Sequence, residues 1–170
     1  FISNKNLHQI GFCGFFWHGK AKMNILVKQI RQHPQGMTSF AKELPSELYY
    51  DLIQHISKIL KDNYYHGFIE IEFLHDATTN NFYILDVNPR AWGYIKILTK
   101  KYPSFAVLFE DFNKPIESIT KSVQFVDLQR DFIAIARRSI MFKFKFLIKD
   151  IASVIKPNTA VNIFELNDPK

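Results

Sequence analysis

The chain has 170 residues, and 47% of them are apolar, which is enough for one domain with a packed core rather than a disordered tail. No apolar run reaches the roughly 18 residues that a membrane-spanning helix needs. The net charge of +6 would suit nucleic acid, a membrane surface or anionic small molecules, but we find no nucleic-acid-binding motif, and the basic residues that follow Ala136 are typical of a solvated helix face.

Two features bear on the context of the chain. Its single cysteine, Cys13, excludes an internal disulfide and predicts a reducing, cytoplasmic environment. Because Cys13 lies in an apolar run, we interpret it as an inert buried thiol. The sequence begins with Phe1 rather than Met, so we expect a fragment of a longer protein whose missing part precedes Phe1.

The first sixty residues predict two strands, a loop and a helix. His8–Trp17 and Met23–Arg31 have the apolar content and alternation of strands. Gln32–Ser39 contains proline and glycine and is expected to form a loop. Leu44–Lys61 predicts a helix, with a proline in its first turn, where a missing N–H costs nothing. Its apolar residues at helical spacing predict a buried stripe of Leu48, Leu52, Ile56 and Ile59.

The stretch from His66 to Trp92 predicts a β-hairpin with one acidic face. Successive side chains of a strand point to opposite faces. In the first strand, Gly67–His75, one face therefore carries Glu70 and Glu72. In the second strand, Phe82–Asn88, one face carries Asp86 and Asn88.

Two registers of this hairpin can be built. If Ala77–Asn81 form a five-residue loop, Glu72 lies opposite Asp86 and Glu70 lies opposite Asn88. A loop shorter by one residue places the acids on different faces, since a one-residue slip turns every side chain over. We favour the first register because it also keeps the apolar residues together on a buried face. Those residues are Ile69, Ile71, Phe73, Leu85 and Val87.

The favoured register places two carboxylates directly across from each other. Such a pair is unfavourable unless something positive lies between its members. A hard divalent cation with oxygen ligands, such as Mg²⁺, would satisfy it, since Mg²⁺ usually binds one or two carboxylates and completes its octahedron with water and phosphate oxygens. The pair Glu72 and Asp86 therefore indicates a metal site.

The remainder of the chain predicts mostly helices. The elements expected are helices at Ile95–Lys101 and Ser104–Phe112, a strand at Ser122–Asp127, and helices at Leu128–Met141 and Leu147–Ile155. Proline at position 103 separates the first two helices, because it cannot continue a helix. We find no internal repeat and no low-complexity linker.

The pattern G-x-x-x-x-E-F, a short hairpin and then D-x-N-P-R resembles the carboxy-terminal half of the ATP-grasp domain. The resemblance is closest to the branch of the carbamoyl-phosphate synthetase large subunit and the carboxylate–amine ligases, and it extends from about Gly11 to Trp92. It implies an α+β fold with a mostly antiparallel sheet flanked by helices. It also implies an ATP-dependent ligase that activates a carboxylate as an acyl phosphate for attack by an amine or similar nucleophile.

The same resemblance implies roles for individual residues. The metal ligands, for Mg²⁺ or Mn²⁺, would be Glu72, Asp86 and Asn88. Arg90 would contact the reacting phosphate. The nucleotide would also be contacted by Asn88 and by a basic residue of the second strand, for which Lys28 and Arg31 are the candidates. Gly36 and Ser39 would approach the substrate from the loop. The family usually has Glu at the second acidic position, so Asp86 is a departure by one methylene.

The resemblance also predicts the organisation of the chain and its partners. Residues 1–113 would form the carboxy-terminal subdomain of an ATP-grasp domain, and residues 114–170 a helical extension packed on it. The partners would be the missing amino-terminal part, a small-molecule carboxylate and an amine, with room for a homodimer but with no membrane and no nucleic acid. Two alternatives stay open: a degenerate, non-catalytic ATP-grasp scaffold, and an unrelated basic domain that contacts nucleic acid.

Overall fold

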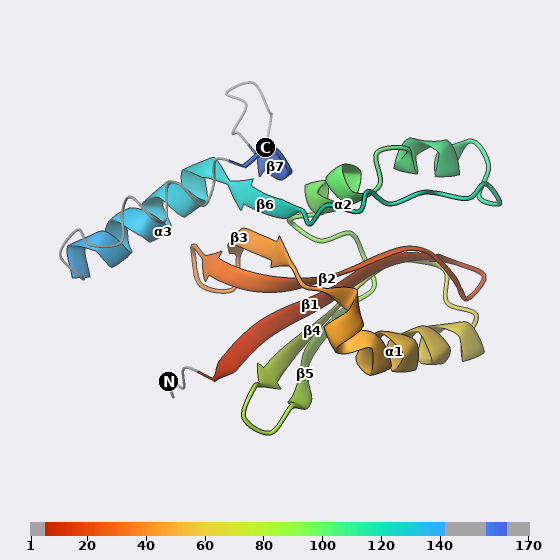
Figure 1. Ribbon diagram of the computed structural model, residues 1–170, viewed down its shortest axis with the longest axis horizontal. Coiled ribbons are helices and arrows are strands. Elements are labelled where there is room, and N and C mark those ends of the chain that lie inside the picture. Colours follow the sequence, from red (N-terminus) through yellow and green to blue (C-terminus); the bar gives the residue numbers. More distant parts are fainter. Residues whose placement is uncertain (1–5, 142–155, 163–170) are drawn as a thin grey trace.

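A seven-stranded sheet organises the computed structural model, which describes residues 6–141 and 156–162 (Figure 1). The strands are β1 (Leu7–Trp17), β2 (Lys20–Gln32), β3 (Thr38–Glu43), β4 (Gly67–Asp76), β5 (Asn81–Asn88), β6 (Gln124–Asp127) and β7 (Thr159–Asn162). Their order in the sheet is β5-β4-β1-β2-β3-β6-β7, and every neighbouring pair is antiparallel except β6 and β7. The predicted α+β fold with a mostly antiparallel sheet is confirmed.

Three α-helices and two short 3₁₀ turns complete the described elements. They are η1 (Ser46–Tyr49), α1 (Tyr50–Asp62), α2 (Lys96–Lys101), η2 (Phe105–Phe109) and α3 (Leu128–Met141). In the described part of the chain, none of the helices is long and apolar enough to cross a membrane. Of the predicted helices, α3 has the expected bounds, whereas Leu147–Ile155 lies outside the described residues.

The apolar face of α1 differs from the predicted stripe. The helix buries Ile53, Ile56 and Leu60, whereas Leu48 is 77% exposed and Ile59 is 50% exposed. The chain makes the 3₁₀ turn η1 before α1 begins at Tyr50, so Leu48 does not share the helical spacing of the later residues. The predicted stripe was therefore wrong for Leu48 and Ile59, whereas it is confirmed for Ile56, which is buried, and for Leu52, which packs against the same cluster.

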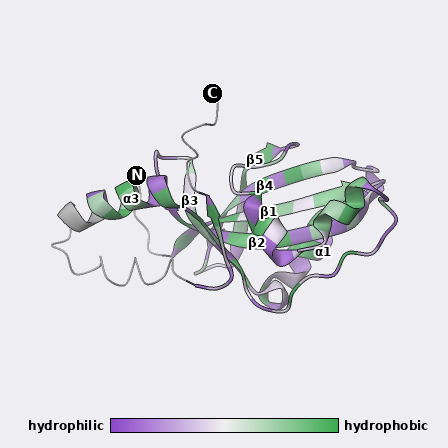
Figure 2. Ribbon diagram, turned by 90° about the horizontal axis from the view of Figure 1, so that it is seen from above, coloured by the Kyte–Doolittle hydropathy of each residue, from purple (hydrophilic) through white to green (hydrophobic). Residues whose placement is uncertain are grey.

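Apolar residues pack on both faces of the sheet. On one face, α1 covers a cluster built from the side chains of β1, β2 and β4 that point towards it, and Figure 2 shows α1 lying in front of these strands. On the other face, the alternate side chains of β1 and β2 pack against the segment from Trp92 to Leu108, which includes α2. The sheet is therefore the middle layer, with α1 on one face and the segment that contains α2 on the other.

The part of the chain after residue 113 is not only a helical extension. β6 pairs with β3, and β7 pairs with β6, so both strands continue the sheet that β1 to β5 begin. Phe125 of β6 is 1% exposed and belongs to the same apolar cluster as the core of β1 and β2. The domain division at residue 113 stays a prediction, but the described residues beyond it contribute to the sheet itself.

β5 is an edge strand, and its apolar side chains are not buried as predicted. Leu85 is 52% exposed and Val87 is 50% exposed, whereas Ile69, Ile71 and Phe73 on the neighbouring β4 are buried as expected. The apolar cluster beneath α1 takes in β1, β2 and β4, and from β5 it gains only the partly buried Phe82.

Candidate active site

The β4–β5 hairpin brings the predicted acids together. Glu72 pairs with Asp86, and Glu70 pairs with Asn88, as the favoured register requires. The route to this pairing differs from the prediction, because the turn has four residues, 77–80, and not five. An irregularity of the ladder compensates: Phe73 pairs with Ile84, so Leu85 is an extra residue in β5. The pairing of the acids is confirmed, and the predicted loop length was wrong.

Neighbouring side chains hold the two opposed carboxylates in place. Gln29 donates from Nε2 to Oε1 of Glu72 over 2.7 Å. Asp86 accepts from the backbone N–H of Val87 over 2.9 Å and from Nδ2 of Asn88 over 3.0 Å. Asn88 therefore contacts Asp86 directly.

The acidic face does not by itself form a cage for a cation. Within the described residues, no three side chains of His, Cys, Asp or Glu gather closely enough to hold a metal ion. Two carboxylates and one amide suit Mg²⁺, which keeps several ligands from water or substrate phosphate. The donor set Glu72, Asp86 and Asn88 fits a magnesium ion whose coordination is completed by phosphate oxygens.

A third acid, Glu70, lies buried beside this pair. It is 5% exposed, and Oε1 accepts a hydrogen bond of 2.7 Å from the hydroxyl of Tyr94. Burial raises the pKa of the Glu70 carboxyl above its ordinary value, the hydrogen bond from Tyr94 opposes this rise, and the nearby charge of Glu72 adds to it. The Tyr94 hydroxyl also lies 3.5 Å from Sγ of Cys13. Burial raises the pKa of both Tyr94 and Cys13, so the phenol and the thiol stay protonated.

A cavity of about 280 Å³ opens above the acidic face. Residues of the hairpin, of the loop that follows it, of the β2–β3 turn and of α3 line it: Glu70, Glu72, Asp86, Asn88, Arg90, Gly93, Tyr94, Gly36, Met37, Thr38 and Arg130. Arg90 is exposed, and its side chain donates two local hydrogen bonds, to the carbonyl oxygen of Ala91 over 3.0 Å and to Oδ1 of Asn88 over 3.4 Å. Its guanidinium therefore lies at the cavity beside the acids.

Lys28 and Arg31 do not join this group. Lys28 pairs with Ile10, whose side chain packs beneath α1, so Lys28 points to the opposite face of the sheet from the acids. Burial also lowers the pKa of Lys28. Arg31 is buried in a two-bonded ion pair with Asp131 of α3, with distances of 2.7 and 2.6 Å. This geometry does not support the predicted contacts of either residue with the nucleotide.

The β2–β3 loop reaches the cavity, but only in part as predicted. Gly36 lines the cavity, whereas Ser39 is fully buried and donates to Asp131 over 3.0 Å. Ser39 is therefore part of the ion-pair cluster that binds α3.

Sequence reasoning missed three polar residues of the site. Gln29 lies on β2 and contacts Glu72, Tyr94 contacts Glu70, and Arg130 lines the cavity from α3. Gln29 lies two residues before Arg31 on the same strand, so its side chain is expected on the same face. This spacing could have identified Gln29 as a candidate. Tyr94 lies in the loop after β5 and matches no motif, and Arg130 carries no comparable signal because α3 brings it to the cavity from a distant part of the chain.

Comparison of the sequence with protein-family models and with curated proteins finds no match. Solved structures do match the fold. Biotin carboxylase from Campylobacter jejuni, in a β-γ-ATP complex, matches with a TM-score of 0.53 and 16% identity over 66% of this chain and 28% of that one. The urea amidolyase of K. lactis matches with a TM-score of 0.53 and 14% identity over 71% of this chain and 8% of that one. The chain has an ATP-grasp fold.

A third matching structure also contains a nucleotide. The biotin carboxylase domain of the Hydrogenobacter thermophilus 2-oxoglutarate carboxylase, in complex with MgADP and bicarbonate, matches with a TM-score of 0.50 and 16% identity over 58% of this chain and 22% of that one. The chain spans less than a third of the length of each of these three proteins. Identities this low show the ATP-grasp fold alone, and membership of the carbamoyl-phosphate synthetase branch stays a prediction.

Proposed function

We propose that this chain supplies the metal- and phosphate-binding residues of an ATP-dependent ligase that activates a carboxylate as an acyl phosphate. The observation that carries the proposal is the opposed pair of Glu72 and Asp86, with Asn88 and Arg90 beside it, at one cavity of an ATP-grasp fold. Two acids directly opposed across β4 and the edge strand β5 are destabilising by themselves. A cation-binding role accounts for it.

In this proposal Glu72, Asp86 and Asn88 hold one or two Mg²⁺ ions. Bound magnesium supplies charge neutralisation for the ATP phosphates. The protein residues position the donors: Gln29 orients Glu72, and the Asn88 amide orients Asp86. Because Asp86 is one methylene shorter than Glu, it suits a contact with a single cation better than a bridge between two.

Arg90 has the role of binding the phosphoryl group that is transferred. Its planar guanidinium can hold two oxygens at once. In the reaction, an oxygen of the substrate carboxylate attacks the γ-phosphorus, and ADP leaves. An amine or similar nucleophile then attacks the acyl carbon of the acyl phosphate, loses a proton and displaces inorganic phosphate. The protein's part is largely positioning and charge compensation.

The rest of the ATP site would come from another part of a longer protein. The match to this chain spans less than a third of each of the three proteins, and the one solved with MgADP is the biotin carboxylase domain of a 2-oxoglutarate carboxylase. The chain alone is therefore expected to bind the metal and the triphosphate weakly and to lack turnover.

Manganese binding tests the proposal on the 170-residue chain. Free Mn²⁺ is measured by electron paramagnetic resonance during titration, with and without inorganic tripolyphosphate. Tripolyphosphate should strengthen Mn²⁺ binding, and Glu72→Gln should weaken it by about tenfold or more, since a carboxylate ligand is lost. The matched control is Asp62→Asn, which removes an exposed carboxylate on α1. Equal Mn²⁺ binding by the Glu72 variant and the control would refute the metal site.

A non-catalytic ATP-grasp scaffold is the second candidate. The observation in its favour is that Asp86 already accepts two hydrogen bonds within its own strand, from Val87 and Asn88. If this arrangement persists, tripolyphosphate will not strengthen Mn²⁺ binding and Asp86→Asn will have no effect on it. The scaffold then replaces the ligase as the better account.

A further inference from the structure

The cavity has a second arginine, which enters it from a distant part of the chain. Arg130 lies in the first turn of α3, directly after β6, and lines the same cavity as Glu72, Asp86 and Arg90. In the sheet, β1, β2 and β3 separate β4 from β6. Arg130 therefore approaches from the side of the cavity away from the acidic hairpin.

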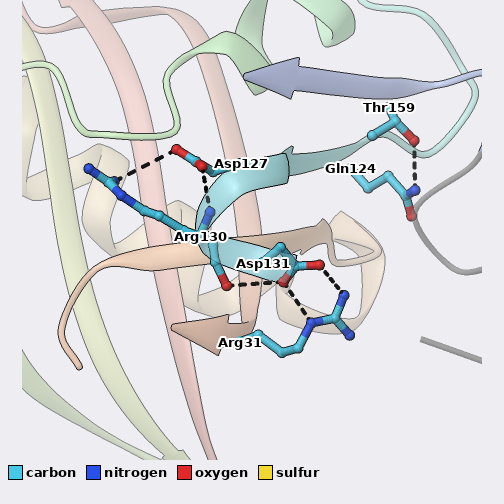
Figure 3. Close-up of polar contacts among 7 residues, drawn as sticks. Arg31, Gln124, Asp127, Arg130, Asp131 and Thr159 are labelled. Atoms are coloured by element: carbon cyan, nitrogen blue, oxygen red, sulfur yellow. Dashed lines mark hydrogen bonds and ion pairs between the residues drawn. The ribbon is translucent and has the colours of Figure 1, made fainter. Parts of the chain in front are cut away.

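Buried contacts fix the first turn of α3 in this place. Asp131 is 1% exposed and binds Arg31 of β2 through two hydrogen bonds, and Ser39 of β3 donates to the same carboxylate (Figure 3). Asp127, at the end of β6, caps the helix by accepting from the backbone N–H of Arg130 over 3.0 Å. The backbone of Arg130 is thus held by both the sheet and the helix cap.

The side chain of Arg130 keeps donors for a ligand. Among the described residues its ion pair is with Asp127 and is long, at 3.9 Å, and 39% of the side chain is exposed. A guanidinium has five N–H donors in a planar fork that matches a carboxylate. Figure 3 shows Arg130 and Asp131 leaving α3 in different directions, so anchoring the helix does not use the Arg130 side chain.

The hairpin and the loop that follows it give the cavity its acids and Arg90, whereas Arg130 lines the cavity from the other side. Glu70, Glu72 and Asp86 come from the hairpin and suit a cation and the groups bound to it. Arg130 comes from the other side, together with Met37 of the β2–β3 turn and Thr38, the first residue of β3. In phosphoryl transfer the attacking and leaving oxygens lie roughly in line across the phosphorus. The attacking carboxylate therefore approaches opposite the leaving ADP, and Arg130 is a cationic lining residue on the side of the cavity away from the proposed metal ligands.

From this division we infer that Arg130 binds the carboxylate of the acid substrate. This inference deepens the proposed function and rests on it, because the bound carboxylate is the substrate only if the chain belongs to such a ligase. The binding of a carboxylate at Arg130 does not depend on the metal site, and the two can be tested separately.

Side-chain NMR of the 170-residue chain tests the inference. The chain has five arginines, so its ¹⁵N spectrum contains at most five Nε–H signals, and Arg130→Gln identifies the one that belongs to Arg130. Succinate is titrated at constant ionic strength, with sodium chloride as the compensating salt. The Arg130 signal should shift with a saturable dependence on succinate. Arg130→Gln should weaken succinate binding, followed at the backbone amide of Thr38, by about tenfold or more, the loss expected for a charged, forked contact.

Two further variants sharpen the test. Arg130→Lys keeps the charge but loses the fork, so succinate affinity should fall between those of the original chain and Arg130→Gln. Arg137→Gln removes an exposed charge from the same helix and should leave succinate binding within about twofold. An equal effect of the variants at positions 130 and 137 would mean that only the net charge matters and would overturn the inference.

A second titration, with inorganic phosphate and tripolyphosphate, separates carboxylate binding from phosphate binding. If these anions shift the Arg130 signal and succinate does not, Arg130 is a phosphate contact and the inference is wrong. If no anion shifts it, the inference is also wrong. Loss of Mn²⁺ binding in Glu72→Gln with unchanged succinate binding would support both sites. Absence of any Mn²⁺ site would refute the proposed function and leave the carboxylate site standing.

Discussion

The hydroxyl oxygen of Tyr94 lies 2.6 Å from the position that a Cβ atom on residue 11 would take. Glycine at position 11 therefore makes room for this hydroxyl on the face of β1. Tyr94 uses the space to donate its hydrogen bond to Glu70 on the neighbouring strand β4. The absence of a side chain at Gly11 thus determines how the buried acid of the cavity is held.

Gly11→Ala should destabilise the fold by about 1–3 kcal/mol, because the added methyl displaces the Tyr94 hydroxyl from a packed core. The free energy of unfolding, from urea denaturation, measures the effect. Tyr94→Phe removes the displaced oxygen and should cost about 1–3 kcal/mol by itself, since Glu70 loses its donor. The double variant should be destabilised by clearly less than the sum of the two single-variant costs.

Gly93→Ala is the control for this series. Apart from residues 92–94, no atom of the described residues lies within 4 Å of the position that its Cβ would take, so stability should change by less than about 0.5 kcal/mol. Full additivity of the Gly11 and Tyr94 variants would show that the hydroxyl is not what the glycine accommodates.

Arg31→Met should destabilise the protein by about 3–5 kcal/mol, because it leaves the carboxylate of Asp131 buried without the guanidinium that balances its charge. The side chains of this pair are 6% and 2% exposed. Lys58→Met, which breaks the exposed pair with Asp62 on α1, should cost no more than about 0.5 kcal/mol. Urea denaturation compares the two. A cost below 1 kcal/mol for Arg31→Met would mean that the ion pair does not anchor α3.

Replacing Glu70 by Gln should change how stability depends on pH. Burial raises the pKa of Glu70 in the folded state, so between the two pKa values the folded chain binds more protons than the unfolded chain. The stability contribution of Glu70 therefore falls as the pH rises from about 4.3, where the unfolded carboxyl titrates, through its higher folded-state pKa. Glu70→Gln removes this fall, at most about 1.4 kcal/mol per pH unit.

Urea denaturation at a series of pH values from 4 to 8 measures this difference. The stability of Glu70→Gln relative to the original chain should rise with pH and then level off. A difference that is constant across the series would show that Glu70 has the same pKa in the folded and unfolded states.

Arg90→Lys should leave the fold intact and impair turnover in a protein that carries the complete site. Arg90 is exposed, and its contacts with Ala91 and Asn88 are local, so the free energy of unfolding should change by less than about 0.5 kcal/mol. Loss of the forked contact in the transition state should cost about 3 kcal/mol, roughly a hundredfold in rate. Normal turnover would remove Arg90 from the mechanism, and unfolding would make it a structural residue.

The pairing of the acids could be predicted because Glu72 and Asp86 lie near each other in the sequence. Strand alternation placed Glu72 and Asp86 on one face, and their pairing follows from a hairpin that spans only residues 67–88. Local patterns determine such a unit. The exposure of Leu85 and Val87 could not be read from the same pattern, because it depends on where α1 stops covering the sheet.

The two predicted nucleotide contacts that the geometry does not support, Lys28 and Arg31, are placed by long-range pairing. Lys28 points away from the acids because of its register with Ile10, and one residue of slip would have reversed this direction. Arg31 was a candidate for the nucleotide because it is basic and close to the loop. Its partner in the structure, Asp131, is one hundred residues further along the chain and lies beside it because β6, which precedes α3, pairs with β3.

The extra residue at Leu85 separates the length of the hairpin turn from the position of the acids. A four-residue turn with the bulge and a five-residue turn without it give the same opposition of Glu72 and Asp86. Homologous chains could therefore exchange one solution for the other through a single insertion in the turn and a single deletion at position 85. When such chains are aligned, a one-residue gap should move between these two places while the acidic columns stay in register.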